Sequence, residues 1–112
     1  MGWQHKDLAS GEWHKLSLIE QMANIGSEIN RVLKWRNKNQ KLFEGAAERT
    51  LELLDLTITD PRWAGFKGRL KEIIRLKELF CGIISGGEKY NSTLNDLNRY
   101  FYQFALAHRL KK

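Results

Sequence analysis

Proline occurs once in this chain, at Pro61, and this feature restricts the fold more than any other. Proline has no backbone N–H and disfavours helix in the residue before it, so a chain with a single proline can form long helices on both sides of it. Strand-like alternation of apolar and polar residues is absent. The sequence therefore predicts an all-α protein with a break at Asp60 and Pro61.

Two helices are predicted before the break. The first begins at Ser17, because Glu20 follows three residues later at the spacing of a capping box, and it continues to about Lys38. The second runs from about Gln40 to Ile58. In both, apolar residues recur at steps of three and four, which predicts one buried face on each helix. These residues are Leu18, Met22, Ile25, Ile29 and Val32, then Phe43, Ala47, Leu51, Leu54 and Ile58.

Two further helices are predicted after the break, over about 68–84, with a glycine stop at 86–87, and over about 92–109. Short connections make neighbouring helices antiparallel, so we expect an up-down-up-down four-helix bundle over 17–112. A short N-terminal lead-in, 1–16, precedes it. The residues predicted to face inward are Leu70, Ile73, Ile74, Phe80, Cys81 and Ile84 in the third helix, and Leu94, Leu97, Phe101, Phe104 and His108 in the fourth.

Four segments resemble a family of small uncharacterised prokaryotic proteins. They are Met22–Arg31, Lys34–Lys38, Glu48–Pro61 and Tyr100–Phe104, and the similarity covers most of residues 5–110. The family is all-helical and has no established function, substrate, catalytic residue or cofactor. The resemblance therefore implies a cytosolic prokaryotic protein and no particular activity.

Residues that commonly carry catalysis or bind metals are scattered. An acidic strip at residues 44–55 lacks the Glu-x-x-His pairs that a di-iron bundle needs. Cys81 and His108 fall on apolar helix faces without a catalytic partner nearby in the sequence. The glycines do not fit phosphate-binding motifs. We therefore expect no catalytic residue, no metal site and no cofactor, and do not expect an enzyme.

The cellular compartment is predicted from what the sequence lacks. Cys81 is the only cysteine and cannot form an internal disulfide. The longest apolar stretch, Leu79–Ile84, is far short of the roughly 20 residues that a membrane-spanning helix needs. We expect a cytoplasmic protein without a membrane partner.

The charge of the chain points to a polyanionic partner. Lys and Arg number 19 against 13 Asp and Glu, a net charge of +6. An antiparallel bundle collects many of these cations, together with Trp13 and Phe66, at the pole that holds the link between the second and third helices. Cations beside aromatic rings suit a phosphate backbone and unstacked bases. The predicted nucleic-acid-binding residues are Lys15, Arg62, Trp63, Lys67, Arg69, Lys71, Arg109, Lys111 and Lys112.

A secondary basic patch is predicted at the opposite pole. Its residues are Arg31, Lys34, Trp35, Arg36, Lys38 and Lys41. Cations at helix ends also complement helix dipoles, and tryptophans at bundle ends also cover cores, so a purely structural role is the competing interpretation of both clusters.

The third helix has an apolar arc wider than one bundle face needs. Leu76, Leu79 and Ile83 form a second apolar strip beside its core positions, which predicts a homo-oligomer interface. We interpret the chain as a non-enzymatic accessory protein that binds RNA or single-stranded DNA, with small basic accessory subunits of reverse transcriptases as a fold-level analogy. The alternative is a protein–protein adaptor that uses the third helix and Trp35.

Overall fold

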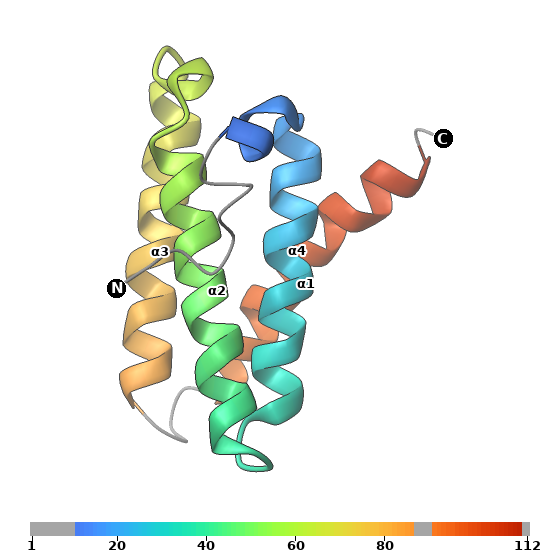
Figure 1. The fold of residues 1–112 in the computed structure, drawn as a ribbon, viewed down its shortest axis with the longest axis vertical. Helices are drawn as coiled ribbons and strands as arrows, with labels where there is room; N and C mark the ends of the chain where they lie inside the picture. Colours follow the sequence, from blue (N-terminus) through green and yellow to red (C-terminus); the bar gives the residue numbers. More distant parts are fainter. Residues whose placement is uncertain (1–10, 87–90, 111–112) are drawn as a thin grey trace.

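The computed structural model describes residues 11–86 and 91–110, in which all regular structure is helical (Figure 1). Figure 1 shows α1, α2 and α3 side by side, with α4 crossing obliquely behind α1. The all-α class is confirmed, and the four long helices are compatible with a helical bundle. The elements are η2 Trp13–Lys15, α1 Leu18–Trp35, α2 Gln40–Ile58, η3 Pro61–Trp63, α3 Lys67–Gly86 and α4 Asn91–Leu110.

Local sequence signals set the ends of α1. The Ser17 hydroxyl accepts a hydrogen bond from the backbone N–H of Glu20 at 3.1 Å, and the Glu20 carboxylate accepts one from the N–H of Ser17 at 3.0 Å. This confirms the predicted capping box. The helix ends at Trp35, before the predicted end at about Lys38, because Asn37 has a φ of 63°. Asparagine tolerates this left-handed conformation better than most residues.

The core is formed by apolar side chains from all four α-helices and from η2. The α1 residues predicted to face inward at 22, 25, 29 and 32 are all buried, and so are the α4 residues at 94, 97 and 101. Residues 11–16, which belong to the predicted lead-in, contribute Trp13, whose exposed fraction is 1%. Residues 1–10 of that lead-in lie outside the described residues.

The α3 helix is rotated relative to the prediction. Ile74, predicted to face inward, is 37% exposed, whereas Ile83, predicted to lie in an oligomer interface, is fully buried. Leu76 packs against the core, and Leu79 alone of the predicted interface is exposed. The prediction for Ile83 is therefore wrong. The apolar arc of α3 is so wide that the helix can bury apolar residues at more than one rotation about its axis. Its fully buried residues are Ile73, Phe80 and Ile83.

A glycine sets how closely α4 packs on α1. A Cβ atom placed at Gly26 would lie 3.0 Å from the Cβ of Phe101, a separation that side chains rarely adopt. The Phe101 Cβ is attached directly to the α4 backbone, so a larger residue at Gly26 can be accommodated only if α4 moves. The close approach of the two helices therefore depends on this glycine.

We predict that Gly26→Ala and Gly82→Ala have different effects on stability. Gly82 lies within α3 with no atom within 4 Å of an added Cβ, so alanine should stabilise the protein by about 0.5–1 kcal/mol through helix propensity. At Gly26 the same gain is opposed by overpacking against Phe101, which typically costs about 1–3 kcal/mol. Urea unfolding of both variants measures the difference. An equal stabilisation by the two substitutions would contradict a rigid α1–α4 contact.

Candidate nucleic-acid interface

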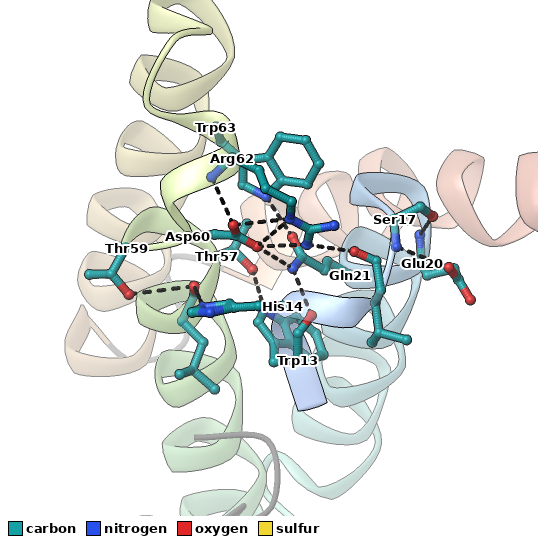
Figure 2. A network of polar contacts seen from close by, with 12 residues as sticks. Trp13, His14, Ser17, Glu20, Gln21, Thr57, Thr59, Asp60, Arg62 and Trp63 are labelled. Atoms are coloured by element: carbon teal, nitrogen blue, oxygen red, sulfur yellow. Dashed lines mark hydrogen bonds and ion pairs between the residues drawn. The ribbon is translucent and has the colours of Figure 1, made fainter. Parts of the chain in front are cut away.

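A buried polar network ties the beginning of α1 to the α2–α3 corner, which we define as residues 60–72 (Figure 2). Its central residue is Gln21, which is fully buried. The Gln21 Nε2 donates to the carbonyl oxygen of Trp13 and to Oδ2 of Asp60, both at 3.0 Å. The Gln21 Oε1 accepts from Nε1 of Trp63 at 2.8 Å. One side-chain amide thus joins η2, α1 and the corner.

Trp13 is a core residue and is not available for base stacking. Its indole N–H donates to the Thr57 hydroxyl at 2.9 Å, and this hydroxyl donates to the carbonyl oxygen of Leu53. Thr57 and Trp13 are both buried. The prediction that Trp13 joins the aromatic surface of the basic pole is therefore wrong, because the helix ends leave an apolar space that its indole fills.

Arg62 lies at the surface of the corner and is anchored by Asp60, whose side chain is fully buried. The guanidinium donates to both carboxylate oxygens, with Nη2 2.7 Å from Oδ2 and Nε 3.1 Å from Oδ1. It also donates to the carbonyl oxygen of Leu16 at 2.6 Å and lies over the Trp63 ring, 4.5 Å from its centre. The charge of Arg62 is therefore largely compensated within the chain.

The same contacts control the ionisation of Asp60. Burial raises the pKa of the carboxyl group, but hydrogen bonds from Arg62 and Gln21 outweigh burial and lower the pKa from 3.8 to about 2. Charged hydrogen bonds of this kind favour the ionised form. Asp60 is thus a carboxylate at neutral pH, and it fixes the geometry of the corner.

We predict that Asp60→Asn destabilises the protein in a pH-dependent way. Because the folded-state pKa of about 2 lies below 3.8, the carboxylate contributes its full stability above pH 3.8 and loses it as the pH falls toward 2. At neutral pH the variant should lose about 1–3 kcal/mol, as expected for hydrogen bonds to a charged group. Denaturant unfolding of both proteins at a series of pH values measures the difference in their free energies of unfolding. If this difference stayed constant as the pH falls toward 2, Asp60 would not act through its charge.

The solvent side of the corner carries an aromatic ring among cations. Phe66 is 62% exposed and meets the edge of the Trp63 ring at a centroid distance of 6.3 Å. Lys67, Arg69 and Lys71 are exposed on the first turns of α3. Arg69 forms an ion pair with Glu72 at 2.9 Å. A shallow hollow lies here, lined by residues 66–69 and Glu72.

The charges of this surface oppose the helix dipole. The first turn of α3 contains no acidic residue, and its cations stand where the helix N-terminus is already partly positive. Each such placement typically destabilises a helix by about 0.3–1 kcal/mol at low ionic strength. An anion bound at this surface would remove that repulsion.

The other residues of the predicted basic pole lie elsewhere or are paired. Lys15 forms an exposed ion pair with Glu12 at 2.9 Å. Arg109 lies over the Tyr102 ring near the end of α4, which Figure 1 shows well apart from the beginning of α3. Lys111 and Lys112 lie outside the described residues. The structure thus brings Arg62, Trp63, Lys67, Arg69 and Lys71 together in one corner, without Arg109.

The secondary basic patch is partly compensated. Arg31 donates to Glu28 at 2.7 Å, and the largely buried Glu28 carboxylate also accepts from Arg49 at 3.0 Å. Lys34 lies over the ring of Trp35, 4.9 Å from its centre, and Trp35 is half-buried. Arg36 is half-buried too. Lys38 and Lys41, beside the α1–α2 connection, are exposed, as are Arg31 and Lys34.

The part of the chain that the structure describes contains no cluster of metal-binding side chains. Within 11–86 and 91–110, no group of three or more His, Cys, Asp or Glu side chains could hold a metal ion. Cys81 is a half-buried free thiol. Among these same residues, no helix is both long enough and apolar enough to cross a membrane.

The sequence shows which cations and aromatic rings follow α2, but it does not indicate that Gln21 organises the corner. The sequence alone places Arg62, Trp63 and Phe66 in the link between the second and third helices. Gln21 was not recognised, because a glutamine at the edge of an apolar stripe carries no distinguishing signal. Its burial between Trp13 and Trp63 becomes apparent only in three dimensions.

Comparisons with known proteins do not add to this description. No protein-family model, curated protein or solved structure matches the chain. The resemblance to small prokaryotic proteins therefore stays a prediction.

Proposed function

We propose that this protein binds single-stranded nucleic acid through the α2–α3 corner, without itself being an enzyme. The observation that carries the proposal is the exposed ring of Phe66 among the cations of the first turns of α3. Proteins that bind single strands combine a cationic surface for the backbone with aromatic rings for the bases. Lys67 and Lys71 supply the first, and Phe66 supplies the second.

The proposal assigns different roles to the two aromatic residues of the corner. One face of the Trp63 ring is covered by Arg62, and the indole N–H is used by Gln21. Phe66 has no such polar tie and is largely exposed. We therefore assign base stacking to Phe66. Trp63 and Arg62 hold the segment that carries Phe66 in place.

The proposal also covers the helix topology, the cellular compartment and the enzyme that the protein assists. We propose that the four helices form an antiparallel up-down-up-down bundle, that the protein acts in the cytoplasm, and that it assists a nucleic-acid enzyme such as a reverse transcriptase. The last step rests on analogy between folds. The adaptor alternative has less support, because Ile83 is buried and Trp35 is half-buried beneath Lys34.

We predict that neutralising the corner weakens binding more than neutralising the opposite pole. Lys67→Gln with Lys71→Gln removes two exposed charges from the corner, and Lys38→Gln with Lys41→Gln removes two from the α1–α2 connection. The slope of log affinity against log salt should fall by about 1.4 for the corner variant, since each phosphate contact on a single strand contributes about 0.7. Fluorescence anisotropy with a labelled single-stranded oligonucleotide, measured at several salt concentrations, gives both slopes.

Two results would contradict this site. Equal losses in the two variants would show that net charge, and not the corner, attracts the nucleic acid. No binding by the parent protein even near 50 mM salt would remove the proposal, because cation–phosphate attraction is strong at about this ionic strength.

We also predict that Phe66→Leu weakens binding to single strands by about 1–3 kcal/mol, the value typical of one base–aromatic stack. Binding to a duplex should change little, because its bases are already stacked. Tyr102→Leu, compared in dilute solution, is the matched control, since Tyr102 is 55% exposed but lies on α4 outside the corner. The same anisotropy titrations compare the variants. An equal effect of Phe66→Leu on single strands and duplexes would exclude stacking.

A further inference from the structure

A groove runs along the junction of α1 and α4, on a surface that the proposed nucleic-acid site does not use. Two adjoining hollows of about 260 and 340 Å³ form it, and they share Ala23, Ser27 and Ala105. These small side chains leave space where larger ones would fill the junction. The close contact at Gly26 keeps the two helices together beneath it. The groove is thus bounded by two helices that are held firmly against each other.

One wall of the groove continues into an exposed apolar strip on α4. Tyr102 lines the groove and is 55% exposed, Leu106 is 43% exposed, and Leu110 is 76% exposed. They follow each other at steps of four, so they share one face of the helix. Large apolar side chains gathered on one exposed face mark interaction surfaces.

We propose that this surface binds a second copy of the chain, with the α4 helices of the two copies antiparallel and related by a twofold axis near Leu106. In that pairing Leu106 meets Leu106 of the second copy, and Tyr102 meets Leu110 of the second copy. Arg109 faces Gln103 of the second copy, so the cation does not oppose another cation. The surface is therefore complementary to itself, as a twofold interface requires.

The charges around the groove favour a protein occupant over nucleic acid. Glu20 lines the end of the groove beside His108 and Arg109, and Asp96 pairs with Arg99 farther along α4. Both signs of charge therefore border the groove, whereas a phosphate backbone favours cations alone. A polar and charged rim around large apolar side chains is typical of a protein interface.

The expected dimer is weak and depends on concentration. Stable interfaces bury about 800 Å² on each partner, which three side chains on one helix do not reach. The α1 side of the groove, with Ala23 and Ser27, must supply the remaining contact. The monomer should therefore predominate in dilute solution, and the dimer should form as the concentration rises.

Two leucines with equal exposure provide the test. Leu106 on α4 and Leu79 on α3 are each 43% exposed, and Leu79 belongs to the α3 strip predicted from the sequence to mediate association. Sedimentation equilibrium should show the parent mass rising from 13.1 kDa toward twice that value. Leu106→Glu should weaken self-association by at least about tenfold, since a carboxylate would be buried at the axis, and Leu79→Glu should leave it unchanged. Circular dichroism confirms that both variants are folded.

A cross-linking measurement tests the twofold geometry directly. In a Cys81→Ser background, Leu106→Cys places two thiols at the axis, so mild oxidation should yield a covalent dimer, whereas Leu79→Cys should yield little. A parent protein that stays at 13.1 kDa at every concentration would overturn the proposal. Loss of association in Leu79→Glu, with Leu106→Glu unaffected, would overturn it equally, and would assign the interface to α3.

Discussion

The side-chain amide of Gln21 joins three segments that are far apart in the sequence, and the arrangement of the α2–α3 corner depends on it. A buried amide must find partners for its N–H groups and its oxygen, because an unpaired polar atom in a core typically costs about 1–3 kcal/mol. Gln21 finds them in Trp13, Asp60 and Trp63. The burial of one polar residue therefore keeps η2, α1 and η3 in a fixed arrangement, and Trp63 in turn contacts the exposed ring of Phe66.

The cations among the described residues differ in how far carboxylates offset their charge. Arg62 is paired with the buried Asp60, and Arg31 shares the largely buried Glu28 with Arg49, so part of their charge is offset within the chain. Lys67 and Lys71 are exposed beside a helix N-terminus, where their repulsion from the dipole is not relieved by an acidic residue in the first turn. The net charge of the chain therefore says less about its partners than the position of these two lysines does.

The two outer helices show how packing selects an exposed surface. The wide apolar arc of α3 is turned so that Ile83 enters the core and Leu79 remains outside. The glycine in α1 lets α4 approach closely through Phe101, while Tyr102 and Leu106 on α4 remain exposed. Although α3 and α4 carry similar apolar patterns, packing therefore leaves different apolar side chains exposed on each helix.

The sequence by itself determined the helices of this protein, because the signals that begin and end them are local. The capping box at Ser17, the break at Pro61 and the apolar stripes of α1 and α4 act within a few residues, so they could be predicted. The tertiary structure alone decided that Trp13 fills the core, that Gln21 organises the corner, and that Leu106 and not Ile83 stays exposed. These outcomes depend on how far each helix rotates about its own axis and on contacts between distant segments. The spacing of apolar residues does not determine this rotation when the apolar arc of a helix is wider than the face that the neighbouring helices cover.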